Sequence, residues 1–139
     1  MIEEAYVSHD VAKLLKEKGF NEPCRMYWEV DVEKVEKNLS EYNSCLHDRT
    51  NKELEILDGT YNKKRYSAPT QQMVMRWLRE VHYLSIEICY RFCFGWFVDI
   101  QYTNRVTEAK EFRDVRSNLY DSYEEVAEVG IRYCLENLI

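Results

Sequence analysis

The clearest pattern along the chain is a strict alternation of apolar and polar side chains in its second half. In LSIEICYRFCF, the even-numbered positions from Leu84 to Phe94 are apolar or aromatic, and the odd-numbered positions are Ser, Glu, Cys and Arg. A period of two predicts a half-buried β-strand. Gly95 permits a turn, and the alternation resumes at Trp96. The sequence therefore predicts a β-hairpin over residues 84–102 whose even-numbered side chains, up to Phe94, share the buried face.

Two segments follow the three-to-four spacing of a helix that buries one face. The first is expected to begin after Ser8, whose hydroxyl can cap it, and to end at Gly19 in a Schellman turn. The second is expected to begin after Ser67, with Pro69 in its first turn. Its apolar stripe consists of Val74, Trp77, Leu78 and Val81.

A third helix is expected at the end of the sequence. Ser122 and Glu125 form a capping box before it. Gly130 lies on its apolar side, where glycine costs about 1 kcal/mol relative to alanine, so this position suggests close packing of the backbone. The apolar side comprises Tyr123, Val126, Ala127, Gly130, Ile131, Cys134, Leu135 and Leu138.

The remaining segments carry weaker patterns. CRMYWEV (24–30) is typical of a strand because of its aromatic residues. For residues 31–66, a short helix and a strand followed by a long loop both fit. ELEIL (53–57) is interpreted as a short strand closed by Asp58 and Gly59, and residues 103–121 as a connection with one short element.

Together these elements predict an α+β fold in a single domain over residues 1–139. An antiparallel sheet that includes the hairpin is expected to pack against about three helices as a two-layer sandwich. The composition agrees, because 139 residues with 45% hydrophobic and 14% aromatic side chains can bury one core. No metal or disulfide is needed to stabilise a chain of this size.

The start of the sequence and the cysteines indicate a compartment. The first twenty residues have neither a basic start nor an uninterrupted apolar run, so we expect no export signal, no membrane association and a cytoplasmic location. Five cysteines, an odd number, are then expected to be free thiols. Cys89 and Cys93 in one strand would lie about 13 Å apart, too far to share zinc. With Cys45 and His47 at no ordinary finger spacing, no metal and no cofactor are expected.

The sequence contains none of the usual catalytic templates. It has no Gly-rich phosphate loop, no G-x-S-x-G, no H-E-x-x-H and no D-x-D-x-D. We therefore expect a protein that is not an enzyme. A small enzyme with a Cys/His site, using Cys45 or Cys89 as nucleophile, remains an alternative because five cysteines and three histidines can assemble in space.

The net charge of −6 conceals a basic segment. Residues 60–93 contain six basic and two acidic side chains, a local balance of +4. YNKKRY (61–66) sets basic side chains between two tyrosines, as single-stranded nucleic-acid binders do. A weak nucleic-acid interaction is thus one alternative function. Its candidate residues are Tyr61, Lys63, Lys64, Arg65, Tyr66, Arg76 and Arg79.

The aromatic residues suggest a different kind of partner. Three Trp and 11 Tyr are more than one small core readily buries, and such side chains are enriched at protein interfaces. The outer face of the hairpin is only partly polar. We therefore predict a homo-oligomer contact or a contact with an unidentified protein through Cys89, Arg91, Cys93 and Phe97.

Three stretches carry a family resemblance: VSHDVAKLLKEKGFNEPC (7–24), SAPTQQMVMRWLREVHYLSIEI (67–88) and YEEVAEVGIRYCLENLI (123–139). They resemble a group of small, uncharacterised proteins from phage-like and mobile genetic elements of anaerobic gut bacteria. The resemblance implies a phage or mobile-element origin and no particular activity, cofactor or site residue. The leading interpretation is a non-enzymatic accessory protein that acts through protein binding or self-association.

Overall fold

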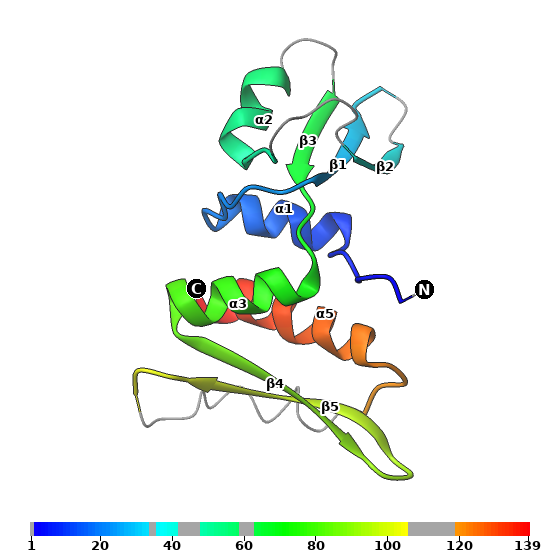
Figure 1. The fold of residues 1–139 in the computed structure, drawn as a ribbon, viewed down its shortest axis with the longest axis vertical. Coiled ribbons are helices and arrows are strands. Elements are labelled where there is room, and N and C mark those ends of the chain that lie inside the picture. Colours follow the sequence, from blue (N-terminus) through cyan, green and yellow to red (C-terminus); the bar gives the residue numbers. More distant parts are fainter. Residues whose placement is uncertain (1, 34–35, 42–47, 59–62, 106–118) are drawn as a thin grey trace. The chain divides into compact units, whose positions relative to one another are not determined.

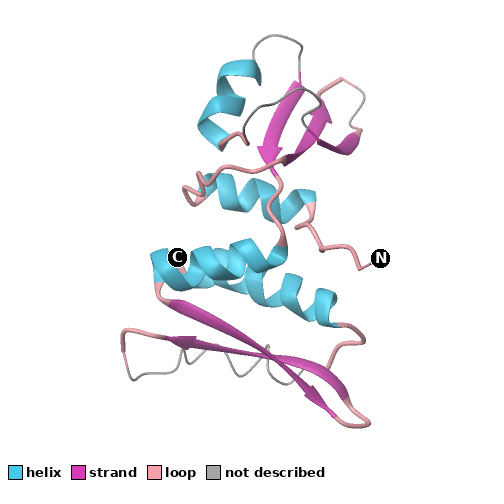
Figure 2. Ribbon diagram, viewed as in Figure 1, coloured by secondary structure: helices cyan, strands magenta, loops and turns pink. Residues whose placement is uncertain are grey.

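The structure, a computed structural model, describes residues 2–33, 36–41, 48–58, 63–105 and 119–139. These residues form both helices and antiparallel strands, and the helices pack on the sheets, which confirms the α+β class (Figure 2). The chain divides into two compact units, Tyr6–Pro69 and Met1–Ala5 with Thr70–Ile139. The single domain over residues 1–139 stays a prediction.

The unit Tyr6–Pro69 contains a three-stranded antiparallel sheet in the order β2-β1-β3 with two helices (Figure 1). In chain order its elements are α1 (His9–Glu17), β1 (Met26–Asp31), β2 (Lys37–Glu41), α2 (Asn51–Asp58) and β3 (Lys63–Ser67). Both α1 and α2 contact β3. The strand predicted over residues 24–30 is confirmed as β1, and β2 favours the strand alternative for the segment after it.

Helix α1 has the predicted beginning and end. The Val11 N–H donates to the Ser8 hydroxyl at 3.3 Å. At the other end Gly19 has φ +87°, and the Phe20 N–H donates to the Leu15 carbonyl at 2.9 Å, which is the long hydrogen bond of a Schellman turn. Both Leu15 and Phe20 are buried.

The strand expected at 53–57 is wrong, because these residues belong to helix α2. A helix forms here because Thr50 and Glu53 make a capping box at its start. The Glu53 N–H donates to the Thr50 hydroxyl, and the Thr50 N–H donates to the Glu53 carboxylate, each at 3.4 Å. Leu54, one position later, is fully buried and anchors the helix.

The expected N-cap at Ser67 is also wrong, because Ser67 is the last residue of β3. Its backbone N–H donates to the side chain of buried Asn51 at 2.9 Å, and the amide of Asn51 donates to the Phe20 carbonyl at 2.8 Å. The cap of the next helix is Thr70, whose hydroxyl accepts from the Met73 N–H at 3.2 Å. A strand therefore occupies a segment that reads from sequence as a polar loop.

The second unit is a hairpin covered on one face by two helices (Figure 1). Its elements are α3 (Gln71–His82), β4 (Leu84–Arg91), β5 (Gly95–Tyr102), α5 (Tyr123–Tyr133) and a final π-helical turn, η1 (Cys134–Leu138). The hairpin predicted over 84–102 is confirmed, with Ile86 opposite Ile100 and Ile88 opposite Val98. Residues 106–118, most of the predicted connection, lie outside the described residues.

Helix α5 confirms the prediction of close packing. The Glu125 N–H donates to the Ser122 hydroxyl at 3.1 Å, so the capping box forms. A Cβ added at Gly130 would lie 3.0 Å from Val98 Cγ2 and 3.3 Å from Ile86 Cγ2. The helix backbone thus rests directly on both strands, and a side chain at this position would require Val98 or Ile86 to shift by a few tenths of an ångström.

Two parts of the predicted burial pattern are wrong. Val81 is 51% exposed, and Met75 takes its place in the core face of α3. The buried face of β4 stops before Tyr90, which is 57% exposed, and Phe92 and Phe94 do not continue it, because the strand ends at Arg91. The Phe94 N–H donates to the Arg91 carbonyl at 2.9 Å, which closes a turn and directs both phenylalanines away from the core.

Candidate functional site

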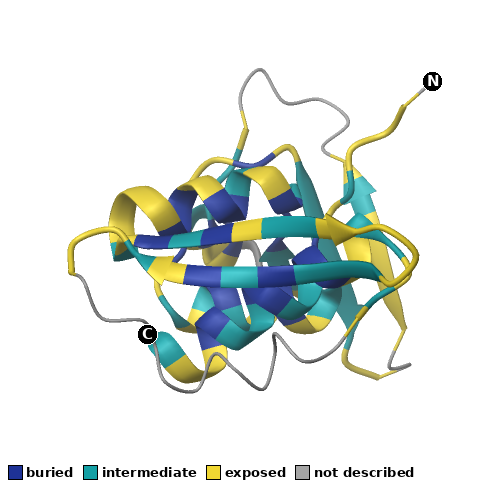
Figure 3. Cartoon of the chain, turned by 90° about the horizontal axis from the view of Figure 1, so that it is seen from below, coloured by how far each residue is buried: buried dark blue, intermediate teal, exposed yellow. Residues whose placement is uncertain are grey.

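The largest cluster of exposed aromatic side chains among the described residues lies at the turn of the β4–β5 hairpin. Phe92 is 80% exposed, Phe94 66% and Tyr90 57%. We call these three residues the aromatic tip. Figure 3 shows the exposed turn at one end of the hairpin and the buried positions nearer the other end. Clustered exposed apolar side chains commonly mark a contact surface.

The tip is exposed because the two helices cover only part of the hairpin. Leu84, Ile86, Val98 and Ile100, which we call the hairpin base, are buried beneath α3 and α5. Beyond them, Trp96 is half-buried and packs against the Tyr123 ring at 5.6 Å between centroids. The ring centroid of Tyr90 lies 5.1 Å from that of Trp96. On the hairpin face that the helices cover, Tyr90 is the first residue that is freely exposed to solvent.

The backbone of the turn is held in an unusual conformation. Cys93 has φ +65°, in the left-handed region, and Gly95 has φ +117°. A Cβ at Gly95 would come within 2.8 Å of the Tyr120 carbonyl oxygen, so glycine is needed there. The left-handed conformation costs a non-glycine residue about 1–2 kcal/mol. The turn thus presents its aromatic side chains at some expense in stability.

The interface residues predicted from sequence lie beside this tip. Cys89 and Phe97 are opposite each other on the outer face and are half-buried, and the Arg91 guanidinium lies 5.6 Å from the Phe97 ring centroid. Cys93 is exposed in the turn and not on a strand. Sequence reasoning missed the aromatic tip because it assigned Tyr90, Phe92 and Phe94 to the buried face.

The basic segment is less available than its sequence suggests. Lys63 and Arg65 both approach the Glu29 carboxylate on the neighbouring strand, at 2.7 and 3.6 Å. On α3, Arg76 pairs with Glu80 at 3.0 Å. Three of the predicted phosphate-binding cations therefore have carboxylate partners, which lowers their attraction for phosphate.

The remaining candidates are divided between the two units. Arg79 is exposed on α3, whereas Lys64 and Tyr66 belong to β3. Tyr61 lies outside the described residues. The structure therefore gathers only part of the predicted nucleic-acid set on one strand.

Lys64 and Tyr66 line a hollow of about 260 Å³. The other lining residues include His9 and Lys13 of α1 and Asp31 of β1. His9 stands edge-on to the Tyr66 ring at 5.4 Å, and burial lowers the pKa of its imidazole, with Asp10 opposing that shift. The hollow is therefore aromatic and mainly basic, and it is smaller than the usual 300 Å³ or more of a drug-sized ligand site.

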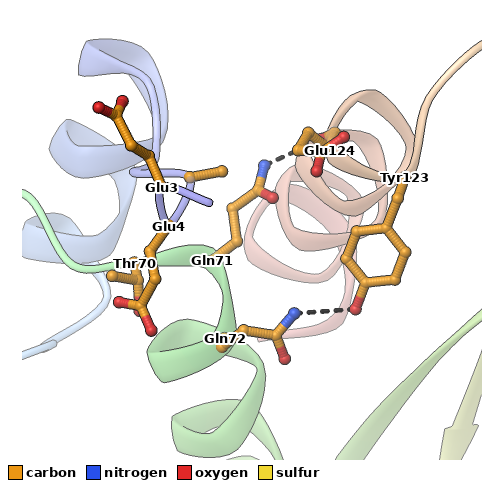
Figure 4. Close-up of a pocket in the computed structure, with 8 residues that line it drawn as sticks. Glu3, Glu4, Thr70, Gln71, Gln72, Tyr123 and Glu124 are labelled. Atoms are coloured by element: carbon orange, nitrogen blue, oxygen red, sulfur yellow. Dashed lines mark hydrogen bonds between the residues drawn. The ribbon is translucent and has the colours of Figure 1, made fainter. Parts of the chain in front are cut away.

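A second hollow, of about 150 Å³, lies where α3 and α5 begin (Figure 4). The Gln71 amide donates to the Glu124 carbonyl at 2.9 Å, and the Gln72 amide donates to the Tyr123 hydroxyl at 2.8 Å. Glu3 and Glu4 also line it. The two hydrogen bonds join the helix ends. The acidic groups complement the positive ends of the helices, so the hollow would repel an anionic ligand.

Two of the thiols, those of Cys24 and Cys134, are buried and unsuited to act as nucleophiles. Burial raises the pKa of Cys24 and of Cys134 to about 12, so both thiols stay protonated and unreactive at neutral pH. Cys45 and His47, the predicted second half of a Cys/His or zinc site, lie outside the described residues. In the described part of the chain no three Cys, His, Asp or Glu side chains gather as metal ligands would.

No protein-family model, curated protein or solved structure matches this chain. None of the helices in the described ranges is long and apolar enough to cross a membrane.

Proposed function

We propose that this protein is a non-enzymatic accessory protein of phage or mobile-element type that acts in the cytoplasm by binding protein through the aromatic tip. The single observation that carries the proposal is the exposure of Tyr90, Phe92 and Phe94 within five residues of one turn. Aromatic side chains supply a large apolar area at low cost in conformational entropy.

Further support comes from the surroundings of the tip. Arg91 and Phe97 lie next to it, and arginine and aromatic residues are enriched where protein interfaces bind most strongly. The cytoplasmic location is supported by the cysteines of the described ranges, Cys24, Cys89, Cys93 and Cys134, which are free thiols. The phage or mobile-element origin rests on the resemblance of the three stretches described above.

Site-specific photocrosslinking in the native host tests this function. With p-benzoylphenylalanine in place of Phe92, we expect covalent capture of a specific protein on irradiation. The same group in place of Ile56, which is 81% exposed on α2, is the matched control. Absence of capture at position 92, equal capture at both positions, or crosslinking to lipid alone would contradict the proposal.

Weak binding of single-stranded nucleic acid is the second candidate function. The observation that favours it is the hollow that combines Lys64, Lys13 and Tyr66. Fluorescence titration with a labelled oligonucleotide should show affinity that falls steeply with salt. Lys64→Glu should weaken binding and reduce the salt slope by about 1, and Lys52→Glu on the exposed side of α2 should not. No binding at low salt would exclude this candidate.

A further inference from the structure

We propose that the protein which binds at the hairpin is a second copy of this chain, paired antiparallel along the outer edge of β4 about a two-fold axis at Cys89. This inference rests on the proposed function and names the partner of that surface. It follows from the backbone hydrogen bonds of the hairpin, the pattern of charge along β4 and the exposure of the part of β4 next to the turn.

Within the described ranges, the backbone of β4 has an open edge. Trp96 of β5 exchanges both of its backbone hydrogen bonds with Tyr120, on the side away from β4. In an antiparallel pair, opposite residues either both bond to each other or both point away. Tyr90, opposite Trp96, therefore directs its N–H and C=O outward, and so do Ile88 and Ile86 at two-residue intervals. No strand in the described ranges pairs with these groups.

The charges on the outer face of β4 are complementary to those of a second, antiparallel copy of the same strand. Glu87 and Arg91 are both exposed and lie two positions on either side of Cys89. When two copies pair about Cys89, Glu87 of each copy lies opposite Arg91 of the other, and this happens twice by symmetry. Opposite charges directly across two strands stabilise the pairing.

Neighbouring registers lack this match. An axis at Glu87 would set two glutamates opposite each other, and an axis at Ile88 would set Glu87 opposite Cys89. Only the axis at Cys89 joins Glu87 to Arg91, because their midpoint is residue 89. The charge pattern thus selects one register as well as one partner.

The inner face supports the same register. Around Cys89 the helices no longer cover the inner face of the hairpin completely, since Ile88 is half-buried and Tyr90 is 57% exposed. Pairing about Cys89 brings Tyr90 of each copy opposite Ile88 of the other, on the side where aromatic and β-branched pairs are favourable. The second copy would therefore cover apolar area that the single chain leaves in water.

Charge reversal with sedimentation equilibrium tests the register. Glu87→Arg or Arg91→Glu alone should weaken the dimer at least about tenfold, because each places like charges opposite each other twice. The double variant E87R/R91E restores both pairs and should return the affinity to near that of the wild type. Thermal unfolding that is unchanged at a concentration low enough for the wild type to be monomeric would show that the monomer fold is intact.

Disulfide trapping tests the axis directly. Opposite residues that are not hydrogen-bonded have Cα atoms about 4.5 Å apart, within the range of a disulfide. In a Cys93→Ser background, diamide should give a covalent dimer, and Cys89→Ser in the same background should not. A wild type that stays monomeric at the highest attainable concentration, no rescue in E87R/R91E, or trapping that does not need Cys89 would overturn the inference. A monomer that still crosslinks another protein from position 92 would overturn the dimer and leave the proposed function standing.

Discussion

The two ends of the β4–β5 hairpin have the same alternating pattern and opposite surroundings. At the hairpin base, the even-numbered side chains are buried under α3 and α5, and Gly130 brings the α5 backbone into contact with Ile86 and Val98. At the aromatic tip, the next even-numbered side chains are exposed. Alternation alone therefore identifies a strand, and the reach of the covering helices decides whether its apolar face is core or contact surface.

This difference separates stability from binding within one element. Side chains at the base should determine whether the unit folds, because they fill a closed core. Side chains at the tip should determine what the protein binds, because they contribute little to that core. Substitutions at the two ends are thus expected to have distinct effects.

The largest effect is expected at the base. Ile100→Ala removes a side chain that is 1% exposed and should lower the free energy of unfolding by about 2–5 kcal/mol, through lost burial and the cavity left behind. Urea denaturation measures the change. Phe92→Ala at the tip is the control and should change stability by less than about 0.5 kcal/mol. Similar losses at both positions would mean that the tip belongs to the core.

A smaller effect is expected where the helix touches the base. Gly130→Val should destabilise by about 1–3 kcal/mol, because added methyl groups have no space between Val98 and Ile86. Gly130→Ala should cost less, since a single Cβ gains helix propensity that offsets part of the clash. Thermal unfolding of both variants gives the comparison. Stabilisation by valine would show that the helix backbone does not lie so close to the strands.

A substitution in the turn should raise stability, in contrast to those at the base. Cys93→Gly should stabilise by up to about 1 kcal/mol, because it relieves a left-handed φ at a residue with a Cβ, less the larger entropy of glycine in the unfolded chain. Cys89→Gly, within β4, is the control and should destabilise. Denaturation curves for both variants decide the matter. A Cys93→Gly variant less stable than wild type would contradict a strained turn.

Acidification should lower the free energy of unfolding. Burial lowers the pKa of His82, whose ring lies 4.6 Å from that of Trp77. The unfolded chain then binds the proton more readily, so the free energy of unfolding should fall as pH decreases through about 6.5. His82→Gln should reduce this pH dependence between pH 7 and 5.5. The same slope in both proteins would assign it to other groups.

Sequence reasoning predicted the elements whose local signals are complete. Helix α1 has its cap and its Schellman glycine, and α5 has its capping box and a glycine where its backbone packs closely on the hairpin. For helix α2 the local signals conflict, because Thr50 and Glu53 form a capping box while the alternating apolar residues of ELEIL (53–57) fit a short strand. Strand β3 could not be found this way, since its ladder to β1 is a long-range interaction.

The candidate site shows the same division. The hairpin and the neighbourhood of its contact residues follow from the alternating pattern, and Cys89, Arg91 and Phe97 lie where it places them. The exposure of Phe92 and Phe94 does not follow, because nothing in their own sequence tells how far α3 and α5 reach. Likewise, the partner of Lys63 and Arg65 is Glu29, which lies more than thirty positions away in the chain.

Residue-resolved amide hydrogen exchange along β4, measured by NMR at low and high protein concentration, tests the central claim most directly. Glu87 and Cys89 amides bond to β5 and should be protected at both concentrations. Ile88 and Tyr90 amides point to the open edge and should become protected only at high concentration, when the second copy pairs with them. Exchange at Ile88 and Tyr90 that is equally fast at both concentrations would contradict the claim.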